Sequence, residues 1–411
     1  MKRLLLVFIV FMIVLLGCQS GAPETVVEAE STQLPLAEAQ EPTEDPETEP
    51  SQMATEEPQT AVVGPVTDEQ LFEAVSAADA AAVEQLLAAG ANPDAIKPSG
   101  YPILKQAVLD SIKSHNTEIV TLLVENGADV NQLDGGGNAV LPLAAGARQL
   151  DVVRLFLDAG ADVNGTSTLI LTDVGPLADA PAVIHAVVGN TIEVLELLIS
   201  HGADLDKTET SSNKTALHIA ATLDRAKIIE LLLENGANPD PPGNKKPLHF
   251  ASEIHKVKSA QALLNGGADP NAQTEAGKTP LMYAVSLGKT SQFGSTGIVT
   301  LLLENGADPN LTDENGKTVL HYAAAGIEKD EAVRILIEHG ASIDLQDNYG
   351  NTALHVAAKN GRMEVVSTLI EEGTSLDMQN EEGQTPLDVA KNEPVIELLQ
   401  KAASSAPLTE G

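Results

Sequence analysis

Nine histidines and a single cysteine, Cys18, are the residues of this 411-residue chain whose types most often hold metals or act as nucleophiles. Four of the histidines, His218, His249, His321 and His355, occupy the fourth place of a recurring six-residue motif, as in TALHIA beginning at 215. Zinc and catalytic sites need further ligands or bases at short, fixed spacing, such as HExxH or CxxC. The sequence contains neither pattern. We therefore expect no metal site.

Motifs for phosphate binding and for nucleophilic catalysis are also missing. The loops GxxxxGKS/T and GxGxxG, whose backbone amides cradle phosphates, do not occur, and neither does the GxSxG nucleophile elbow. The acidic turns at 313–316 and 347–350 lack the ligand spacing of a calcium loop. We expect no cofactor and no catalytic residue, so the sequence does not predict an enzyme.

The charge balance of the chain argues against nucleic acid as a partner. Lys and Arg number 24 against 59 Asp and Glu, which gives a formal net charge of −35. Such a chain repels phosphate backbones, and no run of Lys or Arg concentrates positive charge, so we expect no nucleic-acid binding. Aromatic residues make up only 2% of the chain. The core must therefore be built from Ala, Leu, Ile and Val, as in thin helical layers.

The N-terminus has the layout of a secretory signal. Lys2 and Arg3 precede an apolar run from 4 to 16, which would span about 20 Å as a helix and is too short for a hydrocarbon core of about 30 Å. Residues 15–18, Leu-Leu-Gly-Cys, resemble the bacterial lipobox. That resemblance implies cleavage after Gly17 and acylation of Cys18, with palmitate as a typical acyl chain. Residues 1–17 would then be a lipoprotein signal peptide.

An ordinary signal peptide with an incidental cysteine is the alternative, and Leu16 is bulkier than the residue usual at its lipobox position. Gln19 stands where an Asp would resemble an inner-membrane retention signal of Gram-negative bacteria. The sequence therefore predicts export across the cytoplasmic membrane and a lipid anchor. The outer membrane is the favoured site in a Gram-negative host, and the cell membrane otherwise.

A linker follows the cysteine. Residues 19–66 hold eleven Asp or Glu, seven Pro and no Lys or Arg. Such a segment buries too little apolar surface to offset its ordering entropy, so residues 18–66 are predicted to be a disordered acidic, Pro-rich linker between the lipid and the rest of the chain.

Beyond residue 67 two motifs recur in step, at a spacing near 33 residues. One is GANPD or GADVN, first at 90 and 127, and the other is the histidine motif, as in TALHIA at 215 and TALHVA at 352. Between them lie runs with helical spacing, such as the one from 228 to 233. Each unit thus predicts a turn, a short helix, a second turn, a longer helix and a closing Gly in the left-handed region.

These motifs resemble the ankyrin repeat, whose TPLHxA opens the first helix and whose GADxN follows the second. The resemblance implies an all-α repeat solenoid of helix-turn-helix units with β-turn or hairpin finger loops. We count about ten units over 67–404, followed by a flexible tail at 405–411. Insertions near 111–116, 166–180 and 288–297 are the main departures. His185 lies one residue out of register with the motif.

The resemblance also implies roles for particular residues. The motif histidines, His218, His249, His321 and His355, should hydrogen-bond backbone between neighbouring loops. The aromatic residues that follow the motif's fourth place, Phe250, Tyr283 and Tyr322, are expected to pack in the core. Partner contacts are expected at the loop tips, at the inner face of the first helices and in the 288–297 insertion. The candidates are Tyr349, Asn348, Asn351, Lys317, Phe293, Lys359 and Asn360.

The function predicted from these features is protein binding. A solenoid offers a long surface to a partner, so the chain is expected to be a monomeric, lipid-anchored scaffold or inhibitor in a bacterial cell envelope. The identity of its protein partner is not encoded in these motifs. The alternative is a structural or stress-related envelope protein whose array acts as a spacer with no single specific partner.

Overall fold

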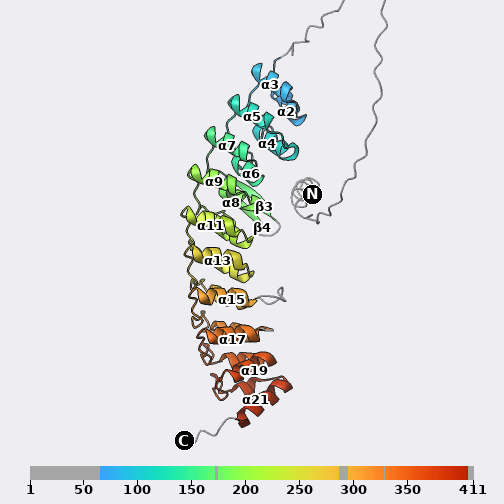
Figure 1. Cartoon of the computed structure of the whole chain (residues 1–411). Helices are drawn as coiled ribbons and strands as arrows, with labels where there is room; N and C mark the ends of the chain where they lie inside the picture. The colour runs from blue at the N-terminus through green and yellow to red at the C-terminus, as the bar shows by residue number, and fades with distance from the viewer. Residues whose placement is uncertain (1–64, 172–174, 287–294, 328, 406–411) are drawn as a thin grey trace, which may run out of the picture. The chain divides into compact units, whose positions relative to one another are not determined.

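The computed structural model describes residues 65–171, 175–286, 295–327 and 329–405, and within them the chain forms twenty helices that follow one another in pairs (Figure 1). The first helices of the pairs are α2 (Asp68–Ser76), α4 (Ile103–Ser114), α6 (Val140–Gly146), α8 (Ala182–Gly189), α10 (Ala216–Thr222), α12 (Pro247–Glu253), α14 (Pro280–Ser286), α16 (Val319–Ala325), α18 (Ala353–Lys359) and α20 (Pro386–Val389). The second helices are α3 (Ala80–Ala88), α5 (Glu118–Glu125), α7 (Leu150–Asp158), α9 (Ile192–Ser200), α11 (Ala226–Glu234), α13 (Val257–Asn265), α15 (Ser295–Glu304), α17 (Asp330–Glu338), α19 (Met363–Glu371) and α21 (Glu393–Ser405). The all-α solenoid predicted from the sequence is confirmed.

The first helices begin where the motif places a capping residue. Thr215, Thr318, Thr352 and Thr385 are the N-caps of α10, α16, α18 and α20. The hydroxyl of Thr385, for example, accepts a hydrogen bond from the backbone N–H of Asp388 (3.3 Å), which satisfies one of the amides left free at a helix start. The recurring Thr therefore fixes where each short helix starts.

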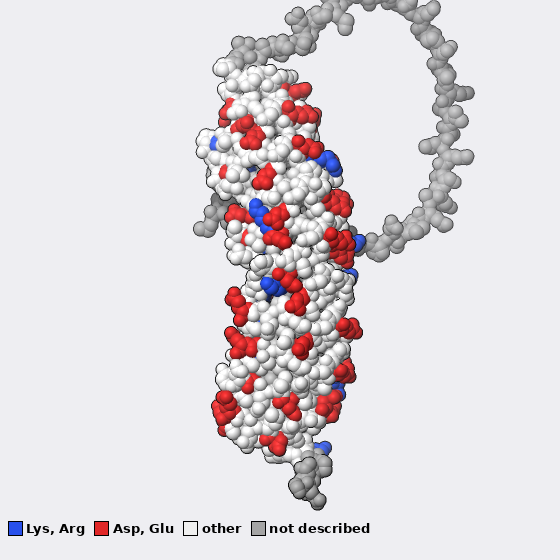
Figure 2. All heavy atoms as spheres, turned by 90° about the vertical axis from the view of Figure 1, so that its left-hand side faces the viewer, with Lys and Arg blue, Asp and Glu red and all other residues white. Residues whose placement is uncertain are grey.

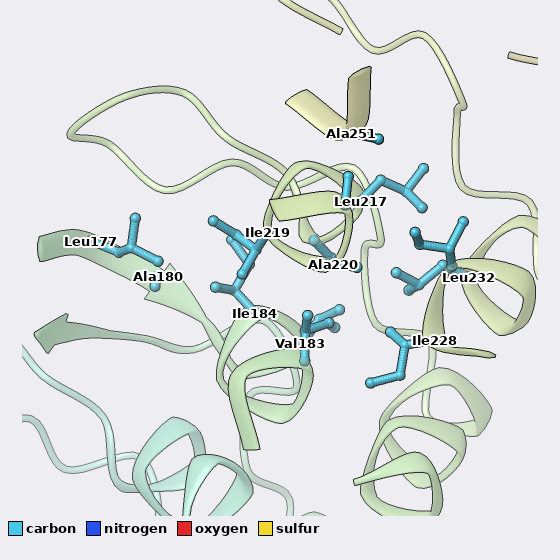
Figure 3. Close-up of a cluster of buried hydrophobic side chains, with 14 of the residues drawn as sticks. Leu177, Ala180, Val183, Ile184, Leu217, Ile219, Ala220, Ile228, Leu232 and Ala251 are labelled. Carbon is cyan, nitrogen blue, oxygen red and sulfur yellow. The ribbon is translucent and has the colours of Figure 1, made fainter. Parts of the chain in front are cut away.

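One continuous core runs through the stack, because each helix packs against its counterpart in the next pair. First helices contact first helices, as α10 does α12, and second helices contact second helices, as α11 does α13. Figure 3 shows side chains from neighbouring pairs in one cluster, with Val183 of α8, Leu217 of α10 and Ala251 of α12 drawn together. Ala220 is fully buried, and its small side chain lets the helices approach closely. The core is mainly aliphatic, as the composition requires, with Phe72 and Phe156 as its buried aromatic residues in the described part of the chain.

Asp and Asn side chains in the loops after the second helices connect successive pairs. The side chain of Asn131 accepts a hydrogen bond from the N–H of Asp162 (2.7 Å) and donates to the carbonyl of Gly160 (3.0 Å). Equivalent bonds to the next loop are made by Asp94, Asn164, Asp206, Asp240, Asn271, Asn310 and Asp344. From Asp94 to Asp344, the last residue of the GADxN motif is therefore a link between neighbours.

Two of the finger loops contain paired strands. β1 (Ile96–Lys97) and β2 (Tyr101–Pro102) form a short hairpin, and β3 (Thr166–Leu171) pairs antiparallel with β4 (Gly175–Pro181). The second hairpin is built from the 166–180 insertion. Leu177 and Ala180 of β4 are fully buried and lie in the same cluster as Ile184 and Ile219 (Figure 3). The hairpin is thus packed against α6 and α8, with Leu177 in the cluster that includes Ile219 of α10, rather than projecting free.

Of the other two insertions, the structure describes the one near 111–116, and it describes little of the 288–297 insertion or of the N-terminal segments. The extra residues near 111–116 lengthen α4 to twelve residues. The signal segment, Cys18, nearly all of the linker and most of the 288–297 insertion lie outside the described residues. Among the residues that the structure does describe, none belongs to a helix long and apolar enough to cross a membrane.

A pair of glycine substitutions tests the packing of the finger loops. Gly340 and Gly350 both have positive φ, +89° and +75°. A Cβ added at Gly340 meets nothing within 4 Å, whereas one at Gly350 would lie 2.7 Å from the backbone nitrogen of Glu381 in the next loop. Both Ala variants should lose about 1–2 kcal/mol to the left-handed conformation, and Gly350→Ala should lose about 1–3 kcal/mol more. Urea unfolding midpoints measure this, and equal losses would contradict the loop contact.

Candidate functional site

The motif histidines of α10, α12, α16 and α18 each join their helix pair to the next. In His218, Nδ1 accepts from the backbone N–H of Thr215 (3.1 Å), and Nε2 lies 2.9 Å from the carbonyl oxygen of Lys245, to which it must donate. Nε2 of His249 donates in the same way to the carbonyl of Lys278 (3.1 Å). His321 and His355 repeat this arrangement with the carbonyl oxygens of Asn351 and Gln384. The rings therefore fix the backbone at the start of the following pair.

These rings are neutral at pH 7. Burial lowers the pKa of His218 and His249 to about 4, because the charged ring would lose its water. Burial also lowers the pKa of His321 and His355. Protonation of Nδ1 would in addition break the bond that this nitrogen accepts from the N-cap residue. Such rings serve as fixed neutral links, not as general bases.

His185 differs from the other four. It lies four residues after the N-cap Pro181, whereas His218 lies three after its own N-cap. Its Nε2 therefore contacts the carbonyl oxygen of Ser167 in β3 (3.2 Å) and not the next pair. Burial lowers the pKa of this ring also to about 4. The shift of one residue makes His185 a support for the β3–β4 hairpin.

Tyr349 and Asn348 lie together on one finger tip. The Tyr349 side chain is 59% exposed, while its carbonyl accepts a hydrogen bond from the N–H of Glu381 in the next loop (3.0 Å). The N–H of Asn348 donates to the carbonyl of Asn315 in the preceding loop (2.9 Å). The backbone of this tip is therefore fixed on both sides, and it presents an aromatic ring to solvent. A fixed exposed ring is a suitable anchor for a partner.

The other predicted contact residues do not form one site with Tyr349. The side-chain amide of Asn351 is engaged within the fold, by Asp347 and by Asn380 of the next loop. Lys359 and Asn360 are exposed, but they lie at the C-terminal end of α18, away from the finger tips at its start. Lys317 is half-buried just before α16, and Phe293 lies outside the described residues.

Three aromatic residues that were expected to pack in the core are only partly buried. Phe250, Tyr283 and Tyr322 are half-buried, and lysine ammonium groups lie over their rings. The Nζ of Lys245, for instance, is 4.3 Å from the centre of the Tyr283 ring. The signal was present in the sequence, since in each case a lysine stands two residues before the first residue of the preceding short helix, α10, α12 or α14. The regular spacing of the motif alone did not show that lysine and ring would meet.

Acidic side chains are spread over the whole face of the solenoid that Figure 2 shows, whereas Lys and Arg are few on it. That distribution agrees with the net charge of −35 and offers no basic surface for nucleic acid on this face. Within the described part of the chain, no three His, Cys, Asp or Glu side chains are grouped so that they could hold a metal ion.

Comparison with known proteins defines the class of this solenoid. A family model of ankyrin repeats, in three copies, matches residues 71–167, 169–243, 289–380 and 329–406, and a single-repeat model matches 246–275. These matches cover more than half of the chain. The chain therefore belongs to the ankyrin repeat family, which is in general non-enzymatic and serves protein–protein interaction.

Individual relatives share only part of the chain. A subunit of the nuclear factor NF-kappa-B of Gallus gallus is 33% identical over 132 residues, which are 32% of this chain and 13% of that protein. The mitochondrial disaggregase of Bos taurus is 32% identical over 32% of this chain and 19% of its own length. The fowlpox virus ankyrin repeat protein FPV230 is 28% identical over 41% of this chain and 83% of its own. The first two matches thus span less than a fifth of those relatives.

The histidine links predict a pH-dependent stability. The pKa of His218 and His249 falls from 6.5 to about 4 on folding, so the unfolded chain binds protons first as the pH drops through this range. Their contribution is complete above pH 6.5 and should be lost toward pH 4, at up to about 1.4 kcal/mol per pH unit for each ring.

A double variant, His218→Gln with His249→Gln, isolates this effect from the many carboxylates. Urea unfolding of both proteins at a series of pH values should show a large difference in midpoint at pH 7 that shrinks as the pH approaches 4. A difference that stays constant over this range would show that these rings do not titrate with folding.

Proposed function

We propose that this chain is a lipid-anchored ankyrin array that binds a partner protein in a bacterial cell envelope and acts there as a scaffold or inhibitor. The observation that carries the binding role is the fixed finger tip with its 59% exposed Tyr349. A loop held by backbone hydrogen bonds on both sides loses little conformational entropy when a partner binds, so more of the contact energy appears as affinity.

The repeat boundaries belong to the same proposal. We propose about ten repeats over 67–404, each made of one of the helix pairs described above, with the first and last acting as caps. The first pair supports this assignment, since α2 starts with a reciprocal capping box in which the Gln70 side chain accepts from the Thr67 N–H (3.0 Å). That box satisfies backbone amides at the start of α2 by local contacts alone, as a capping repeat requires. The array is proposed to be monomeric.

The anchor rests on the sequence of the N-terminus. Lys2, Arg3, the apolar run and the Gly17–Cys18 junction together resemble a lipoprotein signal, and a lone cysteine is then explained by acylation. The acidic, Pro-rich residues that follow would keep the array away from the lipid surface. The outer membrane is the proposed site in a Gram-negative host.

Loss of the exposed ring should weaken partner capture. The Tyr349→Ala variant should retain less than a tenth of the partner captured by the unchanged chain from detergent-solubilised membranes, since anchor residues commonly contribute about 2 kcal/mol or more. Met363→Ala is a matched control, because this side chain of α19 is also partly exposed (36%) but lies on a second helix. Quantitative mass spectrometry measures the stoichiometry. Equal capture by both variants would exclude this tip as the binding site.

The anchor is tested separately at Cys18. The Cys18→Ser variant should incorporate no radiolabelled fatty acid, should retain its signal segment and should leave the detergent phase in a Triton X-114 partition. The unchanged chain should be labelled and remain in that phase. Labelling of the Ser variant, or an unchanged partition, would contradict the assignment of Cys18 as the acylated residue.

A further inference from the structure

Four lysines stand in line at the starts of four successive helix pairs. Each lies two residues before the first residue of its helix, and the four, here called the lysine ladder, are Lys214, Lys245, Lys278 and Lys317 ahead of α10, α12, α14 and α16. The equivalent residues ahead of α18 and α20 are Asn351 and Gln384, and ahead of α6 it is Asn138. In a chain with 24 Lys and Arg against 59 Asp and Glu, this run of cations is exceptional.

Aromatic rings alternate with the ladder. Lys214 lies 5.4 Å from the ring centre of Phe250 in the next pair, Lys245 lies 4.3 Å from that of Tyr283, and Lys278 lies 4.9 Å from that of Tyr322. Three of the four ammonium groups are thus placed by a ring one repeat further on. Because a cation over a ring face keeps its N–H donors available, the contacts orient the lysines without neutralising them.

The row of aromatic rings beside the ladder ends at the β3–β4 hairpin. Ile219 of α10 occupies the place that Phe250 has in α12, but it is fully buried in the cluster that contains Leu177 of the β3–β4 hairpin (Figure 3). The backbone of the hairpin is held against the following loop, where the N–H of Thr210 donates to the carbonyl of Ala178 (2.8 Å). The open row of rings therefore begins at Phe250, immediately beyond the hairpin, and extends to Tyr322.

Most of the ladder lysines lack a direct ion pair with a carboxylate in the part of the chain that the structure describes. Among the residues that the structure describes, Lys245 alone of the four has an ion pair, with Glu253 (2.7 Å). The buried carboxylate of Glu209 is occupied by Ser211, Ser212 and the N–H of Lys214, and that of Asp313 accepts from the Tyr322 hydroxyl (2.6 Å) and from backbone amides. Glu275 and Glu314 are exposed on the finger tips beside the ladder, where they disfavour anions that do not lie over the lysines.

The spacing of the ladder selects a particular kind of acidic partner. Packed helices lie about 8–10 Å apart, so successive lysines repeat at about that interval. Three residues of an extended or polyproline II chain span about 9–10 Å. A carboxylate at every third position would therefore meet one lysine after another.

We infer that the lysine ladder binds an extended acidic segment of a partner protein in which carboxylates recur at every third residue. This inference rests on the proposed function, because it names the chemistry of the protein that the array binds. The half-buried rings would take the apolar parts of the residues between the carboxylates, and the β3–β4 hairpin would limit how far the segment extends.

A synthetic peptide can serve as the probe. The sequence EAQEPTEDPETEP, identical to residues 38–50, carries Glu at its first, fourth, seventh and tenth positions. A fluorescent form of this peptide and a scrambled form without the three-residue spacing are titrated with the full chain at about 50 mM salt, where screening is weak. The regular peptide should bind at least fivefold more tightly by anisotropy. Equal affinities would overturn the spacing argument.

Paired lysine variants provide the matched control. Lys214→Gln with Lys278→Gln removes two cations from the ladder, and Lys227→Gln with Lys258→Gln removes two exposed cations from the second helices α11 and α13. Both variants change the net charge equally. The ladder variant should bind the regular peptide at least tenfold more weakly and the control within twofold. Equal weakening in both would show unspecific attraction and overturn the inference.

A third variant distinguishes binding of a partner protein from binding of the chain's own acidic residues. In the full chain, Glu38, Glu41, Glu44 and Glu47 are changed to Gln. Unchanged peptide affinity supports a partner as the occupant, whereas a tenfold gain would assign the ladder to residues 38–47 of the chain itself. If the peptide fails to bind while Tyr349→Ala still abolishes partner capture, the ladder is excluded and the proposed function stands.

Discussion

The arrangement of this protein depends on a hydrogen bond that crosses from one repeat to the next at four of its junctions. A neutral histidine at the start of one short helix donates to the backbone carbonyl just before the following one, as His218 does to Lys245. The imidazole is buried, and a buried polar group without a partner would cost about 1–3 kcal/mol, so this geometry is strongly favoured. The Asp and Asn side chains of the outer loops provide a second line of links, as between Asn131 and Asp162.

These links also position the surface that a partner would meet. The carbonyls held by His218 and His249 belong to Lys245 and Lys278, which are two of the ladder lysines. The packing of the core therefore sets the backbone from which the cations project. In α14, Met282 takes the place of the histidine, and the following Lys317 lacks this support. At Lys245 and Lys278 the residues that hold neighbouring repeats together also belong to the proposed binding surface.

Much of the fold could be predicted from the sequence, because the motif recurs along the chain and each copy indicates the same local structure. The Thr caps, the aliphatic helices and the left-handed glycines follow from residue types at fixed places. The insertion at 166–180 was less predictable: its length suggests a longer loop, but only the packing of Leu177 shows that it folds back onto α10. The contact of Lys245 with Tyr283 also depends on the pitch between repeats, which one repeat's sequence does not contain.

The neutral, hydrogen-bonded state of the motif histidines is the central claim, since both the stack and the lysine ladder rest on it. Nitrogen NMR of the imidazole rings in the full chain tests it directly. The claim predicts that His218 and His249 carry their proton on Nε2 and that their ring shifts stay unchanged as the pH falls from 7 to about 5, in line with a pKa of about 4. Titration of both rings at the ordinary pKa of 6.5, or protonation on Nδ1, would contradict it.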